Sequence, residues 1–346
     1  MVLISYESVN FLDNFVYLDN SSTTKPCESA IAGINSALGD DWGNPSSLYN
    51  LGLNAQLRVD EAREKLSKML GCRADEIYFT SCGTEGNNTA ILGAAGARKK
   101  RGNRIVTTAI EHPSVLEAMK RLETDGFEVI YLKPDQNGCV REQDIINAVN
   151  DKTILVSIML VNNETGAIQP VAAAARAIKA VGAPSLLHCD AVQAFGKMEI
   201  NAARLGADLI TVSAHKIHGP KGIGALYIKK GVTIKPLLIG GGQENNMRSG
   251  TESVPLICGF LGAMNEMPNI KSVYENMRNL WSYTKDILLE TGLVEINSSD
   301  SSLPYVLNIS VMGYRSETML HFLESKGIYV SSGSACARGK GSYVLH

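Results

Sequence analysis

The sequence predicts an α/β fold in which a mainly parallel central sheet is covered by helices on both faces. Between about residues 60 and 230, short apolar runs alternate with segments of helix-like composition. This alternation is typical of parallel strands joined by right-handed helical crossovers. The run Thr153–Val161 is apolar at nearly every position, as expected of a strand buried on both faces. At 346 residues the chain is long enough for one large and one smaller domain.

The elements of the sheet follow from this alternation in chain order. Short apolar runs predict seven strands, which are Glu76–Thr80, Arg104–Thr108, Glu128–Leu132, Thr153–Val161, Ser185–Cys189, Asp208–Val212 and Ala225–Lys229. The segments between them predict four crossover helices, which are Thr84–Ala97, Pro113–Leu122, Gln143–Val149 and Val171–Val181. Pro113 suits the first turn of its helix, because proline lacks the N–H that a first turn leaves unused.

A second region begins after Pro236, where the sequence pattern changes. Gly240-Gly241-Gly242 opens a loop, and helical patterns then run through Glu252–Glu290. Short strands are predicted at Val294–Ile296 and Tyr305–Ser310, with a helix at Met319–Ser325. We therefore expect a large domain over residues 17–250 and a small α+β domain formed by residues 1–16 and 251–346.

Composition excludes several classes of partner. The net charge of −2 gives no electrostatic reason to expect nucleic acid or an anionic membrane. Glu7 and Asp13 interrupt the apolar N-terminus, which has no basic region and does not resemble a secretory signal. No run approaches the ~20 apolar residues that span a bilayer. The seven cysteines form no Cys-x-x-Cys pair, so we expect no disulfide framework, no metal site and a reducing, cytoplasmic location.

Polar residues gather where the predicted strands end, and ligands of open α/β sheets bind at that edge. The segment Phe79–Glu85 leads from a strand through Gly83 and Thr84 into a helix. Its exposed N–H groups would form an anion site at the helix N-terminus. An ordinary N-cap on Thr84 explains the same residues.

Four further polar residues follow the next strands. His112 comes after Arg104–Thr108, and Asn163 comes after Thr153–Val161. A structural histidine and a simple turn explain these two equally well. Asp190 ends Ser185–Cys189 and is followed by Gln193. A buried aspartate is costly unless a cation or a hydrogen-bond donor meets it.

A lysine, Lys216, follows the strand Asp208–Val212. Partial desolvation and nearby cations can lower the pKa of such an amine until it acts as a nucleophile, although a surface salt bridge is the ordinary alternative. A lysine, a carboxylate and an anion site together match pyridoxal phosphate, which needs one group for its aldehyde, one for its ring nitrogen and one for its phosphate. The phosphate would be held by Gly83, Thr84, Ser213 and His215.

A cysteine, Cys336, ends the run Ser331-Ser332-Gly333-Ser334-Ala335-Cys336. A segment of small residues has little apolar surface with which to pack, so it could deliver a thiol to a site elsewhere. A buried structural cysteine near a frayed end is the alternative.

At this point the chain resembles the NifS/IscS family of cysteine desulfurases, which are fold-type I, pyridoxal-phosphate-dependent enzymes of the class-V aminotransferases. The resemblance covers nearly the whole chain. It runs through Tyr17–Asn20, Gly43–Ser47, Ser81–Asn88, Glu111-His112, Val161–Glu164, His188–Gln193, Ser213–Gly224, Gly240–Glu244, Arg248–Thr251 and Ser331–Cys336.

The resemblance implies roles for the residues around the cofactor. Lys216 would bind the cofactor covalently, and His112 would stack on its ring and assist proton transfer. Asp190 would pair with the ring nitrogen. Gln193 and Asn163 would face the phenolic oxygen of the ring, with Asn163 also near the substrate carboxylate.

The resemblance also implies the reaction. Lys216 would remove the Cα proton of L-cysteine, and Cys336 would take the sulfur as a persulfide and leave L-alanine. The persulfide would pass to a sulfur acceptor protein, either an iron–sulfur scaffold or a thiolation enzyme. Thr251 would reach the phosphate of a partner subunit, which implies a homodimer. The alternatives are a selenocysteine or cystine lyase and a truncated, non-catalytic homologue that acts as a scaffold in sulfur transfer.

The sequence departs from the family pattern in a few places. Tyr49 replaces a histidine, Asn245-Asn246 replaces Arg-Gly, and Cys189 replaces an aliphatic residue or threonine. The chain also lacks the usual C-terminal tail, whose arginine grips the substrate carboxylate. The arginines that could replace it are Arg248, Arg315 and Arg338.

Overall fold

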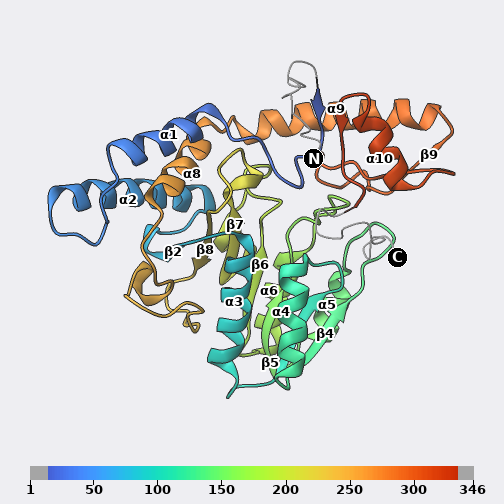
Figure 1. Cartoon of the computed structure of the whole chain (residues 1–346). Coiled ribbons are helices and arrows are strands. Elements are labelled where there is room, and N and C mark those ends of the chain that lie inside the picture. The colour runs from blue at the N-terminus through green and yellow to red at the C-terminus, as the bar shows by residue number, and fades with distance from the viewer. Residues whose placement is uncertain (1–14, 334–346) are drawn as a thin grey trace, which may run out of the picture.

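The computed structural model describes residues 15–333, and a seven-stranded sheet forms its centre (Figure 1). The strand order is β2-β8-β7-β6-β5-β3-β4. Only β8 runs antiparallel to its neighbours, so the predicted mainly parallel sheet is confirmed. The strands are β2 (Ile77–Thr80), β3 (Arg104–Thr108), β4 (Glu128–Leu132), β5 (Thr153–Ser157), β6 (Leu186–Asp190), β7 (Leu209–Ser213) and β8 (Gly224–Ile228).

Helices cover both faces of this sheet, as predicted. The side chains of α3 (Gly83–Arg98) and α4 (Pro113–Thr124) pack on one face together with Ile105. Residues of α2 (Asn50–Leu70), α6 (Val171–Val181) and α8 (Val254–Glu266) pack on the other face together with Val106. Adjacent strand residues thus bury opposite faces, because successive side chains of a strand alternate in direction. The remaining helices on the sheet are α5 (Glu142–Ala148), α6 (Val171–Val181) and α7 (Ala202–Leu205).

The predicted strand Thr153–Val161 extends four residues beyond the strand that the structure contains, β5. The regular ladder of β5 ends at Ser157, although the chain stays buried and extended beyond it. The N–H of Ile158 donates to the His188 carbonyl at 3.1 Å, and that of Leu160 donates to the Asp190 carbonyl at 2.8 Å. The apolar run therefore continues past the ladder and places the turn after Val161 beside the end of β6.

Two long helices, α1 (Glu28–Gly39) and α2 (Asn50–Leu70), precede the sheet and are not among the elements predicted from the sequence. Both pack against α8 (Val254–Glu266) (Figure 1). A Cβ atom on Gly262 would lie 2.2 Å from the Ser29 carbonyl oxygen, so α1 and α8 approach backbone to backbone. Small residues rather than a broad apolar stripe make this contact, which explains why the apolar pattern did not reveal α1.

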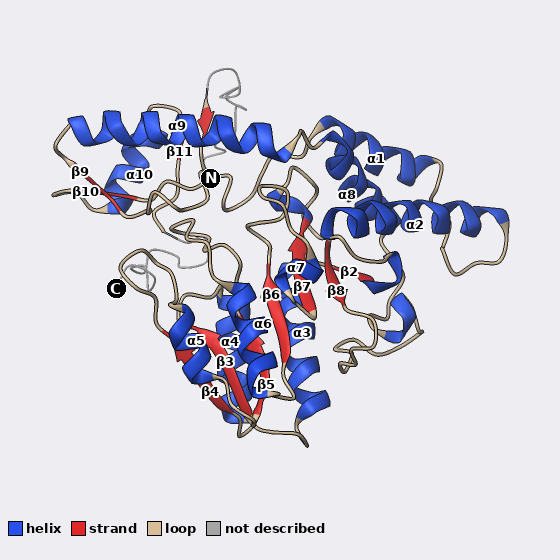
Figure 2. Cartoon of the chain, turned by 180° about the vertical axis from the view of Figure 1, so that it is seen from behind, coloured by secondary structure: helices blue, strands red, loops and turns tan. Residues whose placement is uncertain are grey.

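The last third of the described chain forms a smaller group of elements, seen from behind in Figure 2. These elements are α9 (Ile270–Glu290), β9 (Val294–Ile296), β10 (Ile309–Val311), α10 (Ser316–Glu324) and β11 (Ile328–Tyr329). The strand β1 (Val16–Tyr17) pairs in parallel with β11, so the first described residues pack here. The strand predicted at Tyr305–Ser310 starts later, at Ile309, and the helix predicted at Met319–Ser325 starts earlier, at Ser316. The division into domains at residue 250 stays a prediction.

None of the helices within residues 15–333 combines the length and apolarity that crossing a membrane requires. The same residues hold no cluster of histidine, cysteine and carboxylate side chains suited to a metal ion.

Candidate active site

The turn between β2 and α3 presents backbone donors. At the start of α3, the N–H of Gly86 donates a hydrogen bond to the Cys82 carbonyl at 3.1 Å. The N–H groups of Gly83, Thr84 and Glu85 precede it in the first turn, where a helix offers no internal acceptor. A Cβ atom on Gly83 would lie 2.9 Å from a methyl carbon of Val192, so only glycine allows the turn to lie this close to the segment after β6. These donors have the arrangement that the expected anion site requires.

Ser213, at the end of β7, lies close to this turn. Its Cβ lies 3.7 Å from where a Cβ on Gly83 would be. Ser213 is buried, and its hydroxyl has no hydrogen-bond partner among the described residues. His215 follows in the short turn after β7, where its Nδ1 lies 3.2 Å from the Thr23 hydroxyl. Burial, followed by the charges of Lys216 and Lys221, lowers the pKa of His215 to about 4, so its imidazole is neutral at pH 7.

Asp190 ends β6 and is only 5% exposed. Its Oδ2 accepts a 2.6 Å hydrogen bond from Nδ2 of Asn87, and its Oδ1 accepts one at 3.0 Å from the N–H of Val192. Both donors are neutral, and within residues 15–333 Asp190 forms no salt bridge. Burying a carboxylate without a cation is costly, which is the arrangement expected of a group that receives the positive charge of a ligand.

Asn87 also connects Asp190 to His112. Its Nδ2 donates to the Ser114 hydroxyl at 2.9 Å, and that hydroxyl lies 2.8 Å from Nδ1 of His112. The backbone N–H of Ser114 donates to the same Nδ1 at 3.1 Å, so the neutral ring carries its hydrogen on Nε2. Burial lowers the pKa of His112, with the charge of Asp190 opposing and that of Lys216 reinforcing the shift. Sequence reasoning gave Asn87 and Ser114 no role, because their contacts join separate helices.

Glu111 anchors the segment that carries His112. Its Oε1 accepts hydrogen bonds from the Thr108 hydroxyl at 2.8 Å and the Met159 N–H at 2.9 Å. The carboxyl is fully buried, and this burial, with the charge of Asp190, raises its pKa to about 8. Glu111 is therefore mostly neutral at pH 7 and ties the end of β3 to the extension of β5.

Asn163 lies in the turn beyond that extension. The neighbouring Asn162 shapes this turn, since its Oδ1 accepts hydrogen bonds from the N–H groups of Glu164 at 3.0 Å and Thr165 at 2.9 Å. Nδ2 of Asn162 donates to the Ile110 carbonyl at 3.0 Å. Oδ1 of Asn163 is buried and has no hydrogen-bond partner in the part of the chain that the structure describes.

Lys216 and Gln193 meet at one backbone carbonyl. Nζ of Lys216 donates to the carbonyl oxygens of Ser21 and Ser22, the second at 2.7 Å. Nε2 of Gln193 donates to the same Ser21 oxygen at 2.9 Å. The segment after β1 therefore holds both side chains at the sheet edge, and the sequence contained no signal for this role of two backbone carbonyls.

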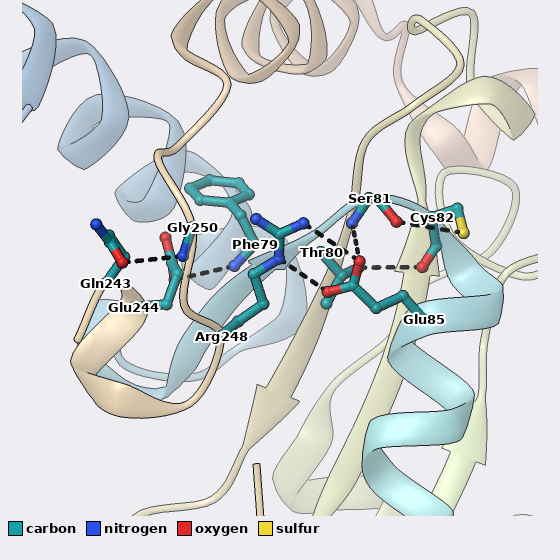
Figure 3. A network of polar contacts seen from close by, with 9 residues as sticks. All are labelled: Phe79, Thr80, Ser81, Cys82, Glu85, Gln243, Glu244, Arg248 and Gly250. Carbon is teal, nitrogen blue, oxygen red and sulfur yellow. Dashed lines mark hydrogen bonds and ion pairs between the residues drawn. The ribbon is translucent and has the colours of Figure 1, made fainter. Parts of the chain in front are cut away.

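A loop that ends at Thr251 is fixed to this site through Arg248 (Figure 3). Nε of Arg248 donates to Oε1 of Glu85 at 3.0 Å, while Oε2 of Glu85 accepts the N–H of Ser81 at 2.9 Å. Arg248 is thus engaged by a carboxylate of the anion-site turn, which disfavours it as the group for a substrate carboxylate. Thr251 itself is exposed.

A second ion pair holds the same loop. The carboxylate of Glu244 accepts two 2.8 Å hydrogen bonds from the guanidinium of Arg63 and one at 3.0 Å from the N–H of Phe79. Glu244, Asn245 and Asn246 all have left-handed backbone conformations, with φ of 47°, 52° and 64°. Side chains other than glycine are disfavoured there, so the ion pair stabilises an unfavourable turn.

The structure thus brings together most of the residues that the sequence singled out. An amine, a buried carboxylate without a cation, an orphaned hydroxyl and a row of N–H groups share one edge of the sheet. These groups are the ones that pyridoxal phosphate needs for its aldehyde, its ring nitrogen and its phosphate. Arg315 is exposed at the start of α10, whereas Arg338 and Cys336 lie outside the described residues.

Comparisons with known proteins identify the family. Residues 16–344 match the family model for class-V aminotransferases. The putative cysteine desulfurase IscS 1 of Bacillus subtilis is 41% identical over 330 residues, which cover 94% of this chain and 86% of that protein. The cysteine desulfurase IscS of Methanosarcina thermophila is 41% identical over 341 residues, covering 95% and 82% of the two chains.

Solved structures give the same result. A NifS-like protein superimposes with a TM-score of 0.89 at 41% identity, covering 92% of this chain and 87% of that chain. A structure described as SspA in complex with cysteine superimposes with a TM-score of 0.85 at 31% identity, covering 95% and 93% of the two chains.

Proposed function

We infer that this chain, which belongs to the class-V aminotransferase family, is a cysteine desulfurase that works with pyridoxal phosphate. Its curated relatives with that activity are 41% identical over more than nine-tenths of the chain. The observation that carries the inference is Asp190, a buried carboxylate held only by neutral donors at the edge where Lys216 lies. A protonated ring nitrogen supplies the charge that this carboxylate lacks.

Each side chain then has a defined task. When bound, pyridoxal phosphate supplies an electron sink that makes the Cα proton of a bound amino acid acidic. Lys216 would hold the aldehyde of this group, and its amine would accept the Cα proton of the substrate. Asp190 would stabilise a proton on the ring nitrogen, while His112 would lie against the ring and transfer a proton through Nε2. Ser213, His215 and the first turn of α3 would bind the phosphate.

Cys336 is the proposed sulfur acceptor. Its thiolate attacks the sulfur of bound L-cysteine, so that an S–S bond forms as the Cβ–S bond breaks. The electron pair of the broken bond stays with the substrate carbon and takes up a proton, which gives L-alanine and a persulfide on Cys336. The charges of Lys216 and Lys221, which both lower the pKa of His215, create a positive environment that favours a thiolate.

A homodimer is the proposed assembly. Exposed apolar side chains crowd α1, the loop after it and α2, and they are Ile31, Leu38, Trp42, Leu48, Tyr49, Leu51, Leu53 and Leu57. Both views place these helices on the same side of the molecule as the loop that leads to Thr251 (Figures 1 and 2). A second copy covering this surface would bring Thr251 close to the phosphate of its partner. The persulfide then passes to an iron–sulfur scaffold or a thiolation enzyme in the cytoplasm.

The proposal is tested by incubating the holoenzyme with L-cysteine and a reductant. We expect equal release of alanine and sulfide, and we expect Cys336→Ser to abolish both while the yellow bound cofactor remains. Cys139→Ser is the matched control and should change neither. Normal sulfur transfer by Cys336→Ser would refute the assignment of the nucleophile.

The same assay separates the alternatives. Faster turnover of selenocysteine or cystine than of L-cysteine would indicate a lyase. Bound cofactor without any alanine release would indicate a scaffold protein.

A further inference from the structure

A second buried lysine, Lys197, has no task in the mechanism above. Lys197 follows β6 in the turn that also carries Gln193, and it is only 7% exposed. Within residues 15–333 its ammonium forms no salt bridge, and Nζ donates a 3.0 Å hydrogen bond to Oε1 of Gln193. A buried ammonium without a carboxylate is unfavourable, so the side chain needs an explanation other than stability.

The unfavourable placement also lowers the pKa of this lysine. Burial, followed by the positive charge of Lys216, lowers the pKa of Lys197 to about 7. A methionine of similar length would fill the same space without this cost. The backbone of Lys197 already takes part in the turn through its N–H, which donates to the Ala194 carbonyl at 3.0 Å, and any residue other than proline would keep that bond.

The side chain controls which way the Gln193 amide faces. The two ends of an amide are similar in size, so packing alone selects poorly between them. In its protonated form a lysine can only donate, and its contact therefore requires the oxygen of Gln193 on its own side. Nε2 then lies on the opposite side, where it donates to the Ser21 carbonyl that Lys216 also contacts.

We propose that Lys197 is a positioning residue, which pins Oε1 of Gln193 so that the amide presents N–H donors, and never its oxygen, to the ring oxygen of the cofactor. The proposal rests on the proposed function, because it concerns the same cofactor. The orientation matters because a phenolic oxygen that carries negative charge accepts hydrogen bonds, whereas the amide oxygen would repel it. Lys197 acts through Gln193 and touches no substrate.

The test uses Lys197→Met, which keeps the length of the side chain and removes the donor. In titrations of the apoenzyme we expect the dissociation constant of pyridoxal phosphate to rise about tenfold, since a hydrogen bond is no longer oriented. The absorption maximum of the bound cofactor should shift as well. The free energy of unfolding of the apoenzyme should stay the same or increase, because a buried charge is removed. Lys120→Met on the surface of α4 is the matched control and should change none of these quantities.

A double-mutant cycle decides whether Lys197 acts through Gln193. If it does, Gln193→Met and Lys197→Met/Gln193→Met should bind the cofactor equally weakly. Additive losses, or an unchanged affinity and spectrum in Lys197→Met, would overturn the proposal. Alanine formation by the unaltered protein is measured in parallel. Failure of that reaction with normal cofactor binding would count against the proposed function alone.

Discussion

Two groups of buried charges in this protein are stabilised in opposite ways. The loop before Thr251 is held by two ion pairs, in which its Glu244 pairs with Arg63 of α2 and its Arg248 pairs with Glu85 of α3. At the end of β6 and in the turn after it, Asp190 and Lys197 form hydrogen bonds only with neutral amides and an N–H group among the described residues. The paired charges hold the backbone in place, whereas Asp190 is left to interact with a ligand and Lys197 to orient Gln193.

The difference has a physical basis. An ion pair with good geometry offsets much of the cost of removing two charges from water, and breaking it leaves the remaining charge without compensation. A buried charge held by neutral donors keeps part of that cost until an opposite charge arrives. The contrast therefore predicts that substitutions in the loop reduce stability, while substitutions at the strand ends reduce activity.

The largest effect is expected at Lys216. Lys216→Ala removes the amine that we propose binds the cofactor and takes the Cα proton, so alanine formation should fall about 10³- to 10⁴-fold. The free energy of unfolding should change much less than the activity, because each hydrogen bond from the amine to a backbone carbonyl contributes only modestly to stability. Alanine release and urea unfolding measure the two quantities, with Lys120→Ala as control. A large loss of stability with full activity in Lys216→Ala would contradict the expectation that substitutions at the strand ends reduce activity rather than stability.

The next largest effect is expected at Arg63. Arg63→Met leaves the Glu244 carboxylate, 1% exposed, without its cation, and should lower the free energy of unfolding by about 3–5 kcal/mol. Arg63→Met/Glu244→Gln should recover part of this loss, because no charge then remains buried. Urea unfolding of both variants measures these changes in the free energy of unfolding. Arg141→Met, which breaks an exposed pair with Asp144, should cost at most about 1 kcal/mol.

A third effect, which depends on pH, is expected at Glu111. The pKa of this carboxyl is raised from 4.5 to about 8 by burial, so the folded state keeps a proton that the unfolded state has lost. The free energy of unfolding should therefore fall as pH rises from about 4.5 to about 8, by up to ~1.4 kcal/mol per pH unit for this group. Glu111→Gln removes the titration and should flatten the slope. Urea unfolding at pH 5, 6, 7 and 8 tests this, and equal slopes for both proteins would refute it.

The sequence predicted the charged part of the site because strand ends leave a local pattern. Asp190 and Lys216 each follow a short apolar run. Because parallel strands end at the same edge of a sheet, the sequence alone predicts that these two residues lie at that edge. Asn87 and Ser114 left no comparable pattern, since their importance arises only when α3 and α4 lie side by side. The same reasoning applies to α1, whose contact with α8 depends on glycines and not on an apolar stripe.

The pairing of β7 with β8 has a consequence for how the protein reaches its active form. These two strands are joined by a short connection that contains Lys216, and Ser213 pairs with Gly224 at its base. Contacts between residues close in sequence form fast, whereas β2 must find β8 across most of the domain. The connection that contains Lys216 should thus close early in folding, and the proposed phosphate site should be completed only when β2 pairs with β8 at the edge of the sheet. Cofactor added to a refolding chain would then bind as one of the last events, and its colour would report on the completed sheet.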